Sequence, residues 1–182
     1  MSDAAQSKHE RMETIWLERA RRLSQRVVLD ESGEKSFPVL ALGVEDERYG
    51  IDLCDVAEVL PPIQATPVPG ASPVFSGVIN VHGEIRPVLN LRRLLGMEGV
   101  LRHSDPTRMI VPRTILLRKE GREMGLQIDS VEQIRWIGPG NLQPAGNGGP
   151  ALAPHFKGLT QDLLMLLSTN ALFAELEKGV TT

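Results

Sequence analysis

The chain contains an internal repeat whose two copies lie 75 residues apart. The first copy reads Gly-Ile-x-Leu-x-x-Val-x-x-Val from residue 50, and the second reads Gly-Leu-x-Ile-x-x-Val-x-x-Ile from residue 125. Each copy follows an apolar run and a charged turn. Because solenoids need at least three stacked repeats, two copies with so long a period predict a duplicated subdomain.

The similarity continues beyond the first motif. Phe75-x-Gly77-Val78 corresponds to Phe156-x-Gly158-Leu159. With three residues removed from one turn, Ile85, Val88 and Leu89 then correspond to Leu163, Leu166 and Leu167. Each half therefore consists of a hairpin, a connection and a second hairpin, and the repeat halves span about 37–96 and 108–176.

Short apolar and β-branched runs, separated by turn residues, predict a mainly β fold. His82-Gly83 marks a tight hairpin turn, because glycine tolerates the positive φ that a two-residue loop needs. The residues from Pro61 to Pro73 form a proline-rich crossing. The expected strands are 39–44, 49–53 continued through 54–60, 77–81, 85–91, 114–117, 124–129 extended through 131–137, 156–159 and 163–167. A short helical turn is expected at 92–95 and a closing helix at 169–178.

Four to five short strands in each half predict two small β-barrels, since closing a sheet removes its open edges. Neither half is large enough to bury a good core alone, so the two barrels should share one. Aromatic residues make up only 4% of the chain, so this core must be built from valine, leucine and isoleucine. We expect the first barrel to take residues 37 to about 62 and then to accept strands from the other half.

Residues 1–36 form an N-terminal extension ahead of the domain at 37–182. Residues 9–28 are predicted to be a helix with an apolar stripe and arginines on its other faces. The stripe consists of Met12, Trp16, Ala20, Leu23 and Val27. Two interpretations stay open: a solvated helix laid against its own domain, or an arm that docks on a partner.

Composition excludes several classes of protein. A net charge of −3 argues against nucleic acid as the main partner. The single cysteine, Cys54, cannot form an intramolecular disulfide. The first residues lack the apolar segment of a signal peptide, and no run approaches the ~18 apolar residues of a membrane span. We therefore expect a cytoplasmic protein without direct membrane insertion.

No catalytic or metal-binding pattern stands out. The carboxylates near strand ends, Asp52, Asp55, Glu58 and Asp129, could form a catalytic pair, but they are more typical of solvent-facing strand positions. The four histidines, His9, His82, His103 and His155, lack the spacing of metal ligands. No serine elbow, dinucleotide loop or phosphate loop is present. The sequence predicts a protein that is not an enzyme and has no cofactor or metal.

The stretch from Gly77 to Leu91 reads G-V-x-N-x-x-G-x-I-x-P-V-x-x-L. This pattern, together with Tyr49-Gly50-Ile51-Asp52-Leu53 and Val56-Ala57-Glu58-Val59 upstream, resembles the signature of the CheW family of chemotaxis coupling proteins. The resemblance covers roughly residues 37 to 176. It implies two five-stranded, SH3-like barrels packed around a common core.

The resemblance also implies a function. A CheW-like protein would be a scaffold that couples a CheA-type histidine kinase, through its regulatory domain, to the cytoplasmic tips of methyl-accepting chemotaxis receptors, and it would be recruited to membrane-associated receptor arrays. The kinase contact is expected at one end of the first barrel, at residues that the sequence does not identify. The receptor-side positions that match this family are Val56, Glu58, Gly77, Asn80, His82 and, on the facing half, Val131.

One position departs from the family pattern. His82 stands where family members usually carry arginine, which is always charged and can bind a carboxylate through two hydrogen bonds. His82 is either a tolerated turn residue or the mark of a changed receptor interface. Two other functions stay open: a CheW-like module of a non-motility chemosensory pathway with an altered receptor side, and a small-ligand sensor that uses the cleft between the barrels.

Overall fold

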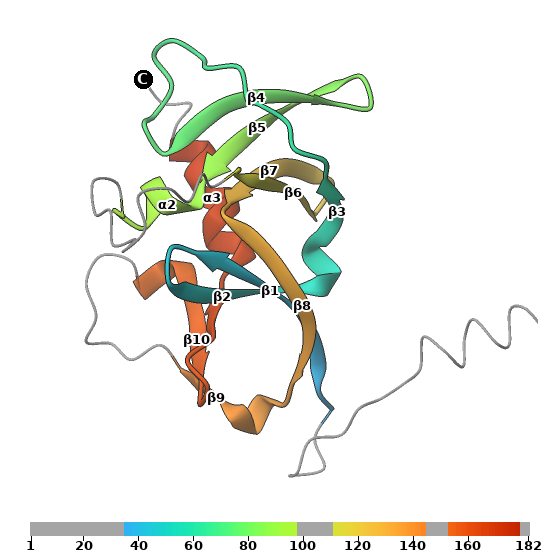
Figure 1. Ribbon diagram of the computed structural model, residues 1–182, viewed down its shortest axis with the longest axis vertical. Helices are drawn as coiled ribbons and strands as arrows, with labels where there is room; N and C mark the ends of the chain where they lie inside the picture. Colours follow the sequence, from blue (N-terminus) through green and yellow to red (C-terminus); the bar gives the residue numbers. More distant parts are fainter. Residues whose placement is uncertain (1–34, 98–110, 145–152, 179–182) are drawn as a thin grey trace, which may run out of the picture.

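The protein is a mainly β structure built from two sheets and few helices (Figure 1). The computed structural model describes residues 35–97, 111–144 and 153–178. In chain order the strands are β1 (Phe37–Val44), β2 (Glu47–Asp52), β3 (Val56–Leu60), β4 (Phe75–Val81), β5 (Glu84–Asn90), β6 (Arg113–Lys119), β7 (Arg122–Ile128), β8 (Ser130–Ile137), β9 (Leu142–Pro144), β10 (Phe156–Thr160) and β11 (Met165–Leu167). The mainly β prediction is confirmed.

The helical elements are short and lie between or after strands. They are α2 (Leu91–Leu94), α3 (Thr169–Lys178) and the 3-10 turns η1 (Leu53–Asp55), η2 (Pro139–Asn141) and η3 (Ala153–His155). The closing helix α3 has the predicted bounds. The Asn90 side chain caps α2 by accepting a hydrogen bond from the backbone N–H of Arg93 at 3.0 Å. The helix predicted for residues 9–28 lies outside the described residues.

Each sheet contains strands from both halves of the chain. The first sheet has six strands in the order β8-β1-β2-β11-β10-β9, and the second has five in the order β3-β6-β7-β5-β4. The first hairpin of each half, β1–β2 or β6–β7, pairs with strands of the other half. Figure 1 shows the second sheet above the first, with α3 between them.

The pairing follows an approximate two-fold relation. β2 runs parallel to β11 with Gly50 opposite Leu166, and β5 runs parallel to β7 with Val88 opposite Gly125. These are equivalent positions in the two copies of the repeat. The same relation makes β8 the partner of β1 and β3 the partner of β6.

This exchange corrects two of our expectations. We expected residues 54–60 to continue β2 and to stay in the first barrel, and residues 131–137 to extend β7. Instead, the η1 turn redirects the chain, so that β3 enters the second sheet, while β8 crosses to the first. The pattern of apolar residues could not reveal this, because a bend between two apolar segments leaves their periodicity intact.

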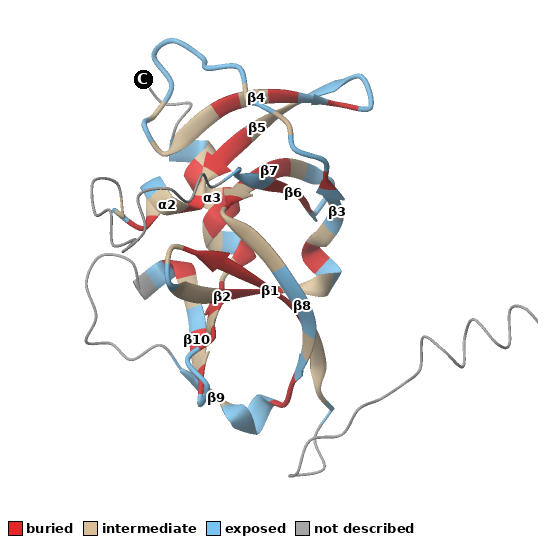
Figure 2. Cartoon of the chain, viewed as in Figure 1, coloured by how far each residue is buried: buried red, intermediate tan, exposed pale blue. Residues whose placement is uncertain are grey.

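The apolar residues form one shared core between the two sheets. A smaller core lies on the opposite face of each sheet. Figure 2 shows buried residues concentrated along β1, β2, β6 and β7. Even-numbered residues of β1 such as Leu42 face the shared core, and odd-numbered ones such as Val39 face the interior of the first sheet. Because both faces are buried, these runs are continuously apolar instead of alternating with polar residues. The shared core also receives Leu172 and Phe173 from α3.

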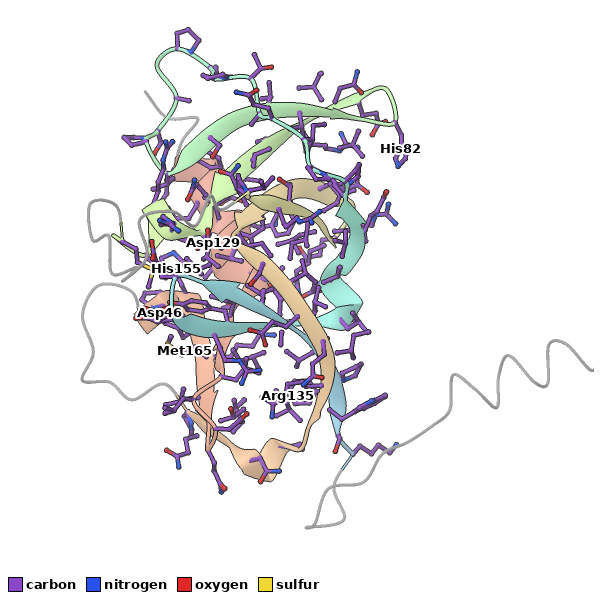
Figure 3. All side chains as sticks on the ribbon, in the orientation of Figure 1. Asp46, His82, Asp129, Arg135, His155 and Met165 are labelled. Atoms are coloured by element: carbon purple, nitrogen blue, oxygen red, sulfur yellow. The ribbon has the colours of Figure 1, made fainter. Side chains whose placement is uncertain are left out.

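A charged network ties the two sheets together. Arg92 of α2 forms ion pairs with Glu45, in the β1–β2 turn, and with Asp129, at 2.6 Å, between β7 and β8. The Asp129 carboxylate also accepts a hydrogen bond from the backbone N–H of Glu45 at 2.7 Å. Arg92 therefore neutralises two carboxylates that the fold brings together. Figure 3 places Asp129 where the two sheets meet.

Arg92→Met should lower the free energy of unfolding by about 2 kcal/mol. Breaking a fully buried ion pair costs ~3–5 kcal/mol, and the partial exposure of Arg92 reduces this cost. Urea unfolding of the full chain measures the change. Arg118→Met is the matched control, because Arg118 is 62% exposed and its ion pair lies within one sheet. The control should lose less than about 1 kcal/mol. Equal losses would show that the ion pairs of Arg92 stabilise the protein no more than an exposed ion pair does.

Candidate functional site

Among the predicted receptor-side residues, those at the tip of the β4–β5 hairpin are the most exposed. His82 and Gly83 have φ values of 52° and 88°, the two positive values of a type I′ turn. Asn80 fixes the turn, since its Oδ1 accepts a hydrogen bond from the backbone N–H of Gly83 at 2.9 Å. The predicted hairpin is confirmed, and Figure 3 shows His82 projecting from its tip.

His82 is connected to the opposite edge of the second sheet. Its Nε2 lies 3.0 Å from Oε2 of Glu58 on β3. β3 and β4 are the two edge strands of this sheet, so the contact joins its ends. The His82 side chain is 76% exposed and that of Glu58 is 42% exposed, which leaves both groups accessible to a partner.

Further charges gather close to this tip. Arg86 of β5 pairs with Glu84 on its own strand and with Glu123 of β7, and Glu123 also accepts a hydrogen bond from Arg118 of β6. The hydrogen bonds from Arg118 and Arg86 lower the pKa of Glu123, so it is ionised at neutral pH. Beneath these charges lies the apolar interior of the second sheet, formed by Leu60, Ile79, Val81, Val88 and Leu116. The charges therefore form a polar rim over an apolar core.

Ile85 is a residue of this surface that the sequence pattern did not indicate. Ile85 lies directly opposite Asn80 in the hairpin, so the two side chains share a face, and Ile85 is 61% exposed. We counted it as an apolar residue of a buried strand. The alternation along β5 gave no signal of this, because Ile85 is in step with Leu89, which is fully buried, and only the end of the hairpin leaves Ile85 uncovered.

Val56 and Val131 lie at the junction of the two sheets. Both are partly buried and pack against the shared core, Val56 from β3 and Val131 from β8. They occupy equivalent positions in the two copies of the repeat. The structure therefore separates the predicted residues into a polar group at the hairpin tip and an apolar pair at the sheet junction.

Gly77 belongs to neither group, and its surroundings give it a structural role. It lies at the start of β4, where its neighbour Val78 exchanges two backbone hydrogen bonds with Thr66 of the proline-rich crossing. Gly77 has φ 134°, and a Cβ there would lie 2.0 Å from the backbone oxygen of Thr66. Only glycine lets the crossing approach β4 this closely.

Gly77→Ala should destabilise the protein by more than about 3 kcal/mol, because backbone strain of ~1–3 kcal/mol adds to a clash with the main chain. Gly83→Ala is the matched control, since its φ is also positive but a Cβ there meets nothing within 4 Å. We expect that control to lose only about 1 kcal/mol. Chemical unfolding measures both, and similar losses would mean that the contact with Thr66 is unimportant.

The carboxylates that we weighed as a catalytic pair serve different roles. Asp55 is buried and receives two hydrogen bonds from Lys119, at 3.0 and 3.1 Å, while Asp129 pairs with Arg92. Our expectation that these two face solvent was wrong, because each neutralises a neighbouring cation. The structure does not bring them together as a pair.

Other chemistry finds little support in the described part of the chain. No group of three or more histidine, cysteine, aspartate or glutamate side chains there could hold a metal ion. Partial burial and the neighbouring Asp52 and Asp55 carboxylates raise the pKa of Cys54 to about 11, so its thiol is protonated at neutral pH. Among the described helices, none is long and apolar enough to cross a membrane.

One pocket of about 460 Å³ opens on the second sheet. It is lined by Pro62, Ile63, Gln64, Ala65, Ser76, Val111, Pro112 and Gln127. These residues come from β4, β7 and the connecting segments, so this pocket is separate from the junction between the sheets. It therefore does not support the idea of a ligand sensor that uses that junction.

Comparison with known proteins decides the family. Residues 38–177 match the family model described as the CheW-like domain. The chain belongs to the CheW-like family. It is 28% identical over 120 residues to a chemotaxis protein CheW of Rhizobium meliloti, covering 65% of this chain and 70% of that protein. It is 34% identical over 118 residues to the protein FrzA of Myxococcus xanthus, with the same coverage.

A solved structure shows the same fold. The scaffolding protein TtCheW from Thermoanaerobacter tengcongensis aligns with a TM-score of 0.62 at 22% identity, covering 73% of this chain and 89% of that one. At this identity the likeness establishes the architecture alone. The match of residues 38–177 to the family model confirms as family membership the resemblance found in the sequence motifs.

Proposed function

We propose that this protein is a non-enzymatic scaffold that couples chemoreceptors to a CheA-type histidine kinase in chemosensory signalling. Its membership of the CheW-like family carries this proposal. The names of several relatives, which describe chemotaxis proteins, and of a structural neighbour, which is a scaffolding protein, support it. In this role the protein would act in the cytoplasm, at receptor arrays on the membrane.

We also propose that each sheet closes into an SH3-like barrel and that both barrels belong to one domain, residues 37–182. Two side-chain contacts support closure. Glu58 of β3 meets His82 at the tip of the β4–β5 hairpin, and Arg135 of β8 pairs with Asp162 in the β10–β11 turn. In each half of the chain, the contact joins the third strand (β3 or β8) to the tip of the second hairpin (β4–β5 or β10–β11). The approximate two-fold relation requires this correspondence.

The receptor would bind across the junction between the barrels. Asn80, His82 and the half-exposed Glu58 provide a polar rim, and the partly buried Val56, two residues before Glu58 on β3, and Val131 on β8 provide apolar contacts. An apolar strip with a polar border suits the helical tip of a receptor. Gly77 contributes indirectly, because it anchors the β4 strand that carries Asn80. Coupling then arises from the difference in affinity of the scaffold for the two signalling states of its partners.

A second candidate is a CheW-like module with an altered receptor side. The identity of residue 82 favours it, because histidine occupies an exposed position where the family usually carries arginine. Here the protein would keep its kinase contact but serve a different receptor or a non-motility pathway.

A binding assay with purified partners tests the proposal. The full chain should bind both the regulatory domain of the cognate kinase and a receptor-tip fragment, each alone and both together. Binding to the kinase domain without the receptor fragment would favour the second candidate. Binding to neither would contradict the coupling function while leaving the fold intact.

His82→Arg should change receptor affinity without changing kinase affinity. Arginine is always charged and offers two parallel hydrogen bonds to Glu58 or to a receptor carboxylate, which are worth about 1–2 kcal/mol more than a single hydrogen bond from histidine. Titration calorimetry with the receptor-tip fragment and with the kinase domain measures the two affinities. If receptor affinity is unchanged, His82 is only a tolerated turn residue.

A further inference from the structure

An exposed apolar patch lies on β8, outside the proposed receptor-side residues. Ile134 is 54% exposed and Trp136 is 47% exposed, and they share one face of the strand because they are two residues apart. Opposite them on β1 lie Leu40 and Pro38 respectively. We call Ile134, Trp136 and Pro38 the β8 apolar face.

The β8 apolar face continues the shared core. Side chains opposite each other in an antiparallel pair lie on the same side of the sheet. Leu40 belongs to the shared core and is only 5% exposed, whereas Ile134 beside it faces solvent. The surface that holds the two sheets together therefore runs outwards along β1 and β8 beyond the cover that the described residues provide. Contiguous exposed apolar surface marks an interaction site more often than singly exposed apolar residues do.

The N-terminal segment of the chain is delivered directly to this face. β1 begins at Phe37, which lies opposite Ile137 of β8, so the preceding residues leave the sheet at the end of β8 that carries Trp136. Residues 1–34 lie outside the described part. Within them, the sequence predicts the amphipathic helix at 9–28 whose stripe includes Trp16 and Leu23. The eight residues between Val28 and Phe37 can span up to about 26 Å when extended, which is ample for the helix to fold back.

We propose that residues 9–28 dock their apolar stripe onto the β8 apolar face. The apolar stripe is long enough to cover this face, since a helix from Met12 to Val27 is about 22 Å long and Ile134 and Trp136 lie about 7 Å apart along the strand. A short linker holds the segment near its target at an effective concentration of the order of millimolar. This favours the chain's own segment over a second copy or another protein as the occupant.

The docked segment lies beside the receptor-side surface. Val131, one of the predicted receptor contacts, is on the same strand as Ile134 and three residues before it. Docking therefore places the segment next to the junction at which a receptor would bind. This consequence rests on the proposed function, whereas the docking itself does not.

The two tryptophans of the chain make the docking measurable. Trp16 lies on the stripe and Trp136 on the target face, and the chain contains no others. Trp16→Phe keeps the stripe apolar and leaves Trp136 as the sole fluorescent reporter in the full chain. In this background, Leu23→Asp places a charge in the stripe. Gln25→Asp introduces the same charge on the opposite side of the predicted helix and serves as the matched control.

Docking predicts that Leu23→Asp shifts Trp136 emission to longer wavelength and increases its quenching by acrylamide, while Gln25→Asp changes neither. Removing residues 1–34 should give the same red shift as Leu23→Asp. Circular dichroism and urea unfolding confirm that all variants keep the domain folded. If emission and quenching at Trp136 are the same in all these proteins, the proposal is overturned.

Dilution distinguishes the occupant. The Trp136 signal should be independent of protein concentration, because the segment and its target belong to one chain. A signal that is lost on dilution would show that a second copy covers the face, and would overturn intramolecular docking. A peptide of residues 1–34 with Trp16→Phe, added to the truncated domain, should restore the blue-shifted emission, with a far weaker apparent affinity than the tethered segment. Failure of receptor or kinase binding would leave this result unaffected, so the two proposals fail independently.

Discussion

The parallel pairing of β2 with β11 and of β5 with β7 is the interaction on which the rest of the structure depends. Each pairing joins the first hairpin of one half to the second hairpin of the other. Backbone N–H and C=O groups in a buried strand must find partners, and here the partners belong to the other half of the chain. Neither half can therefore satisfy its own strands, and the two copies of the repeat fold as one interlocked unit.

The shared core follows from this interlocking. Because the central hairpins lie between two apolar environments, both of their faces are buried, and α3 fills the space between the sheets. Cooperative packing of this kind keeps the relative position of the two sheets fixed, since well-packed interiors do not deform continuously. A rigid junction is what a scaffold needs if it is to transmit a rearrangement from one partner to another.

The hairpin tips are the parts that this constraint leaves free to vary. The turn at His82 and Gly83 needs only a suitable backbone conformation, so its side chain is available for recognition. The contact between His82 and Glu58, and its counterpart between Arg135 and Asp162, show that the same tips also carry charges across the ends of the sheets. Substitution at a tip can thus alter a binding surface with little effect on the core.

Most of the strands, the repeat, the glycine turn at residue 83, the helix at 169–178 and the family could be predicted from the sequence, because each shows in short motifs of neighbouring residues. The sequence did not predict β9, which lies in a segment rich in glycine and proline. Contacts in the folded protein determine that β3 and β8 exchange sheets, that Asp55 and Asp129 are held in ion pairs, that Ile85 faces solvent and that Gly77 supports the proline-rich crossing. These features depend on contacts between segments up to about a hundred residues apart. Local periodicity reports which residues prefer burial, but the choice of partner is made by long-range hydrogen bonding and packing.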